Sequence, residues 1–156
     1  MTLLSAIETE VSNLSKAVRF EYSTLELANA TIFDTLSSGQ FPVCLILAFD
    51  ITDSSRENGR VVSEAEVNAL FLDRVPNSTI DQPIKDIDSQ VIAPMRDLSR
   101  ELINRLDKND IIEAEGIASV VNRSVHEPLM DCHLYGNWAV FTVKFSEDIT
   151  TCEGIE

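Results

Sequence analysis

The stretch Phe41-Pro-Val-Cys-Leu-Ile-Leu-Ala-Phe49 sets the expected fold, because it is apolar, uncharged and rich in residues that favour strands. It is too short and too uniform for an amphipathic helix and therefore predicts a strand that is buried on both faces. Pro42 stands near its start, where a missing backbone donor does little harm. The residues on either side should then supply the neighbouring strands and the covering helices.

A polar segment and then an alternating one follow this strand. Residues 50–60, Asp-Ile-Thr-Asp-Ser-Ser-Arg-Glu-Asn-Gly-Arg, are turn-prone and predict a long exposed hairpin loop. From Val61 to Val75 apolar and polar residues alternate, which predicts a long strand that runs antiparallel to the Phe41 strand. The apolar members of this alternation are Ala65, Val67, Ala69 and Phe71.

Two stripes of apolar residues at three- and four-residue spacing predict helices, one from Leu3 to Val18 and one from Ile84 to Leu106. Thr2 is placed to cap the first helix. In the second helix, acidic residues near the start and basic residues near the end complement the helix dipole. Pro94 lies inside the second stripe, where it either kinks the helix or marks the beginning of its regular part.

The other segments have weaker patterns. Alternation from Val18 to Tyr22 predicts a short half-buried strand, and residues 25–40 predict a loop or a weak element. Two later strands are expected, Ile117–Val125 and Asn137–Phe145, the second after a turn at Tyr135-Gly-Asn.

Together these elements predict an α+β fold. We expect an antiparallel sheet with two main helices packed on one face and a long hairpin loop between central strands. The 156 residues suggest one domain, which we place at 1–146, followed by an acidic C-terminal tail at 147–156.

The charge balance restricts the classes of partner. Twelve basic and 26 acidic residues give a net charge of −14, which opposes binding to nucleic-acid backbones and to anionic membranes. No signal peptide is visible and the longest apolar run is far too short to cross a bilayer, so we expect a soluble protein made in the cytoplasm. The three cysteines form no CxxC pair, which favours a reducing compartment.

Candidate reactive groups are few. His126, Cys132 and His133 invite a metal reading, but their spacing matches no zinc site. Asp50, Asp53 and Glu57 provide only fragments of a calcium loop. The sequence contains no GxSxG motif, no GxGxxG motif and no P-loop. We therefore predict a protein that is not an enzyme, with no catalytic residue, no metal and no cofactor.

The order of elements resembles the tail-terminator and neck-ring proteins of tailed bacteriophages. The resemblance is carried by patterns of element type over most of the chain, and the 107–136 region departs from it. The segments that carry it are Leu3-Leu-Ser-Ala-Ile7, Val18-Arg-Phe-Glu-Tyr22, Phe41-Pro-Val-Cys-Leu-Ile-Leu47 with the loop after it, Glu64–Asp73, Leu98-Ser-Arg-Glu-Leu-Ile-Asn-Arg-Leu106 and Asn137–Ser146.

This resemblance implies a structural virion protein that forms an oligomeric ring at the head–tail junction or the tail end. Its partners would be copies of itself and the neighbouring neck, tail or portal proteins, and it would be assembled in the cytoplasm of the bacterial host. DNA would pass through the ring without specific binding, since like charges repel. The expected subunit-interface or channel residues are Asp50, Asp53, Arg56, Glu57, Arg60, Glu64 and Glu66.

Two other functions compete with this one. The first is an acidic cytoplasmic interaction module, or DNA mimic, that occupies a basic groove on a target. The second is a small enzyme, for example a hydrolase that uses Cys132 or His133.

Overall fold

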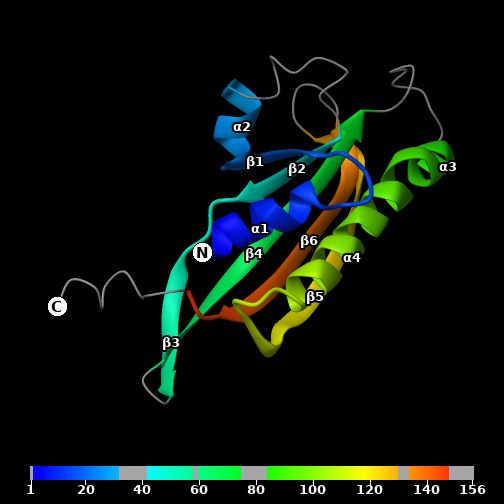
Figure 1. Ribbon diagram of the computed structural model, residues 1–156. Coiled ribbons are helices and arrows are strands. Elements are labelled where there is room, and N and C mark those ends of the chain that lie inside the picture. Colours follow the sequence, from blue (N-terminus) through cyan, green and yellow to red (C-terminus); the bar gives the residue numbers. More distant parts are fainter. Residues whose placement is uncertain (1, 32–41, 58–59, 75–83, 130–133, 148–156) are drawn as a thin grey trace.

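The computed structural model of the chain describes residues 2–31, 42–57, 60–74, 84–129 and 134–147. The helices are α1 Leu3–Ser12, α2 Leu25–Thr31, α3 Ile84–Ile87 and α4 Ala93–Asp107, with a π-helical segment, η3, at Asp88–Ile92. The strands are β1 Arg19–Ser23, β2 Val43–Leu47, β3 Ile51–Glu57, β4 Arg60–Arg74, β5 Ile112–Leu129 and β6 Leu134–Phe145. The fold is α+β (Figure 1).

The strands form one six-stranded sheet. Five of them follow the order β1-β2-β4-β6-β5, and the sixth, β3, pairs with β4 outside this order. β2 and β3 both pair antiparallel with β4, β2 along residues 69–72 and β3 along residues 60–65. β1 pairs with β2 in parallel, so the prediction of a wholly antiparallel sheet is wrong. The reason lies in the connection between them, because parallel neighbours need a crossover, and α2 lies in that connection.

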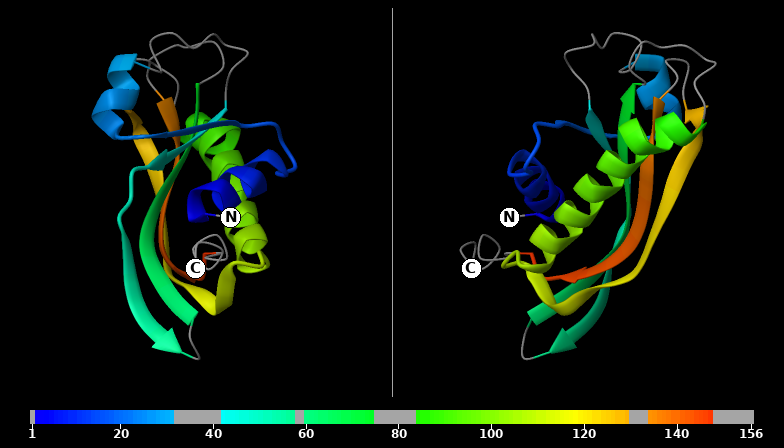
Figure 2. Two further views of the ribbon diagram at one scale, coloured as in Figure 1. Left: turned by 60° about the vertical axis from the view of Figure 1, so that its left-hand side comes forward. Right: turned by 90° about the vertical axis from the view of Figure 1, so that its right-hand side faces the viewer.

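Helices α1 and α4 lie against one face of the sheet (Figures 1 and 2). Their apolar residues share one core cluster with the inward residues of β4 and β6, such as Val67 and Phe141. α2 lies against the opposite face near one end, where Ala28 packs with Val43 and Leu45. The burial of β2 on both faces follows from these two layers, as the apolar run predicted.

Polar residues misled the sequence interpretation of residues 50–60. That segment is not a long loop, because residues 51–57 form β3 and pair with β4. The exposed side chains at Ile51, Thr52 and Asp53 give no apolar alternation, so the strand depends on backbone pairing that sequence periodicity does not report.

Three other boundaries differ from prediction. α1 ends at Ser12 rather than at Val18, and α2 occupies part of the region predicted as a loop or weak element. Tyr135-Gly-Asn lies inside β6 and is not a turn. A Cβ at Gly136 would lie 1.9 Å from the Phe71 carbonyl oxygen on the adjacent strand. Glycine therefore permits a close approach of the two backbones at this position.

Pro94 is the second residue of α4, and the regular part of the second predicted helix begins at Ala93. The turns before it, Asp88–Ile92, are π-helical. Helical backbone precedes Pro94 without a break, so the proline removes one backbone donor inside a continuous helical run, and the run departs from regular α-geometry in the turn just before it. Pro94 thus stands where the regular part of the helix begins, which was one of the two predicted alternatives.

β5 is an edge strand with an irregular pairing to β6. Its register shifts between Ile112 and Ile117, between Ala118 and Val121, and again after Val125. Glu115 and Ser119 have φ values of 56° and 55°, in the left-handed region that non-glycine residues seldom adopt. These bulges interrupt the free edge of the sheet.

Within the described ranges, no helix combines the length and the apolar character needed to cross a membrane.

Candidate interaction surface

The hairpin of β3 and β4 extends beyond the rest of the sheet (Figure 1). β6 pairs with β4 only from Ser63 onward, whereas β3 continues to pair with residues 60–62. We call the described residues 54–57 and 60–62, which form a two-stranded part of the sheet, the β3–β4 arm. An isolated two-stranded hairpin is marginally stable in water, so such an arm gains most when it packs against another surface.

The seven residues predicted from sequence as an interface all lie on this hairpin or at its base. Asp50 precedes β3, and Asp53, Arg56 and Glu57 lie in β3. Arg60, Glu64 and Glu66 lie in β4. The structure thus gathers residues from the predicted loop at 50–60 and from the predicted strand after it into one paired hairpin.

The carboxylates at the base of the arm are largely open to solvent. Asp50, Asp53 and Glu66 are exposed and Glu64 is half-buried. The Ser63 hydroxyl donates a hydrogen bond to Asp53 Oδ1 at 2.9 Å, which orients that carboxylate. Among the described residues, no basic side chain forms an ion pair with any of these four carboxylates. This group, Asp50, Asp53, Glu64 and Glu66, is called the acidic arm base.

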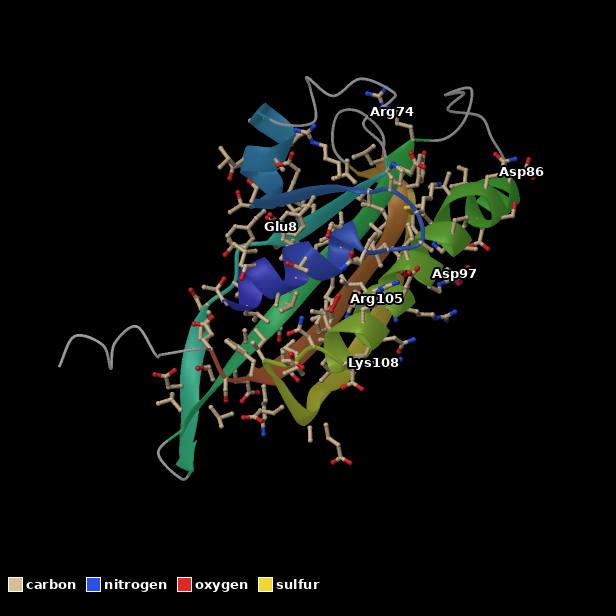
Figure 3. All side chains as sticks on the ribbon, viewed as in Figure 1. Glu8, Arg74, Asp86, Asp97, Arg105 and Lys108 are labelled. Carbon is tan, nitrogen blue, oxygen red and sulfur yellow. The ribbon has the colours of Figure 1, made fainter. Side chains whose placement is uncertain are left out.

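The solvent side of α4 differs in charge. Residues 93–108 carry four basic and three acidic side chains, a net charge of +1 in a chain of net charge −14. A shallow groove of about 520 Å³ lies on this side of the helix. Its lining residues are Asp97, Arg100, Glu101, Asn104, Arg105 and Lys108, and we call it the α4 groove (Figure 3).

Glu101 is held by groups on two elements. The backbone N–H of Ser15 donates to Oε1 at 2.8 Å and the Ser15 hydroxyl donates to Oε2 at 2.7 Å. Arg105 Nε lies 3.3 Å from Oε1. The hydrogen bond from the Ser15 hydroxyl, followed by the other donors, holds the pKa of the Glu101 carboxyl below its usual range. This carboxylate is therefore already satisfied within the chain.

The two remaining cations of the groove are less engaged. Arg100 Nη1 lies 3.8 Å from Asp97 Oδ1, with both side chains mostly exposed, which is a weak ion pair. Lys108 caps the C-terminus of α4, and no ion pair joins it to another described residue. The sequence interpretation had assigned these basic residues only to the helix dipole. The signal that it missed was the spacing of Arg100, Asn104 and Lys108, which places all three on one helix face.

A third surface is the sheet face that α2 leaves open. Trp138 lies in β6, and its indole N–H donates a hydrogen bond to Asn68 Oδ1 of the adjacent strand β4 at 3.0 Å. Val121 of β5, opposite Val140 of β6, is 45% exposed. Arg123 and Lys144 are exposed on the same face.

The groups considered for metal binding or catalysis do not come together in the described part of the chain. His126 Nε2 lies 3.7 Å from Asp88 Oδ1, and both side chains are about half exposed. Cys132 and His133 lie outside the described residues. Within the described ranges, no three potential metal ligands form a group. Cys44 is fully buried, and burial raises the pKa of its thiol, so it is a core residue and not a nucleophile.

One polar cluster is buried between α4 and the sheet. Ser99 Oγ and Asn137 Nδ2 both donate to Asn122 Oδ1, at 3.1 and 2.8 Å. Arg96 donates to Ser124 Oγ at 2.7 Å beside them. These bonds join α4 to β5 and β6, which is a structural role.

No protein-family model matches the chain, and no curated protein matches it either.

Proposed function

We propose that the chain is a structural virion protein that assembles into an oligomeric ring at the head–tail junction or the tail end of a tailed bacteriophage. The observation that carries this proposal is the β3–β4 arm, which extends beyond the β4–β6 pairing that begins at Ser63 and, among the described residues, has no third strand to support it. A neighbouring copy of the chain would provide the missing packing surface.

The element order supports the same proposal. A helix and a short strand, a doubly buried strand, a hairpin, a long strand, a long helix and a closing strand follow one another along the chain. This is the order on which the resemblance to tail-terminator and neck-ring proteins rests, with α2, β3 and β5 as additions. No resemblance in chemistry is involved, because that family acts by assembly.

The charge of the chain fits a ring through which DNA passes. Acidic residues outnumber basic ones by 26 to 12, so carboxylates outside the acidic arm base remain to line a channel. A channel lined by such groups repels the phosphate backbone and lets it slide without specific contacts. In this proposal the ring is located in the virion, at the head–tail junction or at the tail end.

An arm-shortened variant tests the proposal. Deletion of Arg56, Glu57, Arg60 and Val61 leaves Asn58-Gly59 between Ser55 and Val62, which are already cross-strand partners. Asn-Gly favours the two-residue turn that such a hairpin needs. We expect this variant to keep the circular dichroism and the melting temperature of the unaltered chain, and to lose assembly.

Light scattering after size-exclusion chromatography, together with electron microscopy, measures that assembly. Rings from the unaltered chain, and smaller species from the shortened one, would support the proposal. A strict monomer at all concentrations, alone and with purified portal or tail proteins, would contradict it. Tight binding of that monomer to a basic protein would favour the acidic interaction module instead.

A further inference from the structure

We propose that the α4 groove of one copy receives the acidic arm base of the next copy, so that the ring closes through a head-to-tail contact between opposite charges. This inference rests on the proposed ring function and adds the surface that the arm meets. The groove presents Arg100, Asn104 and Lys108, all hydrogen-bond donors, and the arm base presents carboxylates.

The positions of the two surfaces suit such a contact. β3 lies on the β1–β2 side of β4, whereas α4 packs over β4, β6 and β5 on the other side (Figures 1 and 2). Arg105 and Lys108 lie along α4, away from β3 (Figure 3). Two different patches on opposite sides of one subunit are what a heterologous interface needs, and such interfaces produce closed rings when the rotation allows.

The electrostatic balance favours this groove over other surfaces. The groove carries three cations and two carboxylates, and Glu101 is occupied by Ser15 and Arg105. Its net charge is therefore positive where the chain as a whole is strongly negative. Without such a patch, copies with a charge of −14 would repel one another at every approach.

Two edges of the sheet, those of β5 and β3, offer no easier contact. β5 is broken by bulges at three places, and the β3 pairing also shifts register between Asp53 and Ser55. Bulges hinder edge-to-edge pairing because the donors and acceptors fall out of register. At these two edges a contact between side chains is therefore favoured over backbone pairing.

Charge reversal tests the inference. Arg100→Glu with Lys108→Glu should abolish ring assembly at low salt, and so should Asp50→Lys with Asp53→Lys. A chain that carries all four substitutions should assemble again, because the opposite charges are restored. The matched control is Arg123→Glu with Lys144→Glu, which changes the net charge by the same amount on the open sheet face and should leave assembly unchanged.

Each variant is compared with the unaltered chain by light scattering at about 0.1 M salt, where exposed charges still interact over roughly 10 Å. Circular dichroism confirms that each variant is folded. Rings that survive reversal of the groove, or loss of rings in the control as well, would overturn this inference alone. Failure of the fourfold variant to assemble would overturn it too. Absence of rings from the unaltered chain would instead remove the proposed function on which it rests.

Discussion

Gly136 is a single position where the absence of a side chain lets two strands lie against each other. A Cβ there would meet the Phe71 carbonyl oxygen at 1.9 Å and the Phe71 carbonyl carbon at 3.0 Å. Both are backbone atoms of a buried strand and cannot turn away as a side chain would. Any substitution must therefore displace β6 or β4.

We expect Gly136→Ala to lower the free energy of unfolding by about 3 kcal/mol, at the upper end of the usual range for overpacking. Urea denaturation followed by circular dichroism measures it. Val140→Thr, a partly exposed change on the same strand, serves as the control and should cost far less. Equal midpoints for the two variants would contradict the close approach at Gly136.

Cys44 supplies a test of the core at the same scale. It is fully buried, and burial raises the pKa of its thiol above the ordinary value of 9.0. The unfolded chain loses this proton near its ordinary pKa while the folded chain keeps it. The contribution of the neutral thiol to stability is therefore complete below about pH 9 and is lost as the pH rises beyond that value.

In a Cys132→Ser, Cys152→Ser background, a disulfide reagent should modify Cys44 only as fast as the protein unfolds. The modification should become rapid in denaturing urea, and stability should decline above about pH 9. Fast modification of the folded chain at neutral pH would show that Cys44 is accessible.

At the scale of elements, the bond between Ser15 and Glu101 joins the segment after α1 to α4. Its donors lower the pKa of Glu101 in the folded chain. A lowered pKa means that the stabilisation is present above the ordinary value of 4.5 and is lost as the pH falls below it.

Glu101→Gln should reduce the free energy of unfolding at pH 7 by about 1 kcal/mol, a modest figure because the site is open to solvent. The difference from the unaltered chain should shrink as the pH is lowered through the acidic range. Urea titrations at several pH values measure this. Asp97→Asn, one turn earlier on α4, is the control, and a constant difference at every pH would exclude the ionic origin.

The helices and strands differ in how well they could be predicted from the sequence. β2, β4 and β6 could be predicted, because their side chains pack in the core. Such packing produces an apolar run or an alternation in the sequence. β3 could not be predicted, since it is held by backbone pairing with β4 and by hydrogen bonds of two polar side chains, Thr52 and Asp53, and its described side chains face water. The parallel pairing of β1 followed from a crossover through a short helix that has no strong stripe of its own.

The candidate interaction surface, too, could be predicted only in part from the sequence. The acidic residues Asp50 to Glu66 could be named from the sequence, because a polar, turn-prone stretch predicts exposure. The spacing of Arg100, Asn104 and Lys108 could have indicated the basic side of α4, but the engagement of Glu101 could not be predicted, because its donor Ser15 lies 86 positions away in the sequence. No local pattern reports which carboxylate is already occupied by a distant donor.

For the whole molecule, the net charge of −14 predicts two opposite responses to salt. Sodium chloride screens self-repulsion, so the melting temperature of the arm-shortened monomer should rise between about 0.05 and 1 M salt. The same screening should weaken ring assembly of the full chain, because the proposed contact joins opposite charges. Calorimetry and light scattering over one salt series measure both, and assembly that strengthens with salt would point to an apolar contact.

The irregular rim formed by β5 has a further consequence for crowded solutions. The β5 strands of two copies cannot pair over a long stretch. A register that pairs the backbone donors and acceptors of one segment fails in the next segment, beyond Glu115 or Ser119. Fibre growth by backbone pairing along that flank is therefore disfavoured, even at high protein concentration.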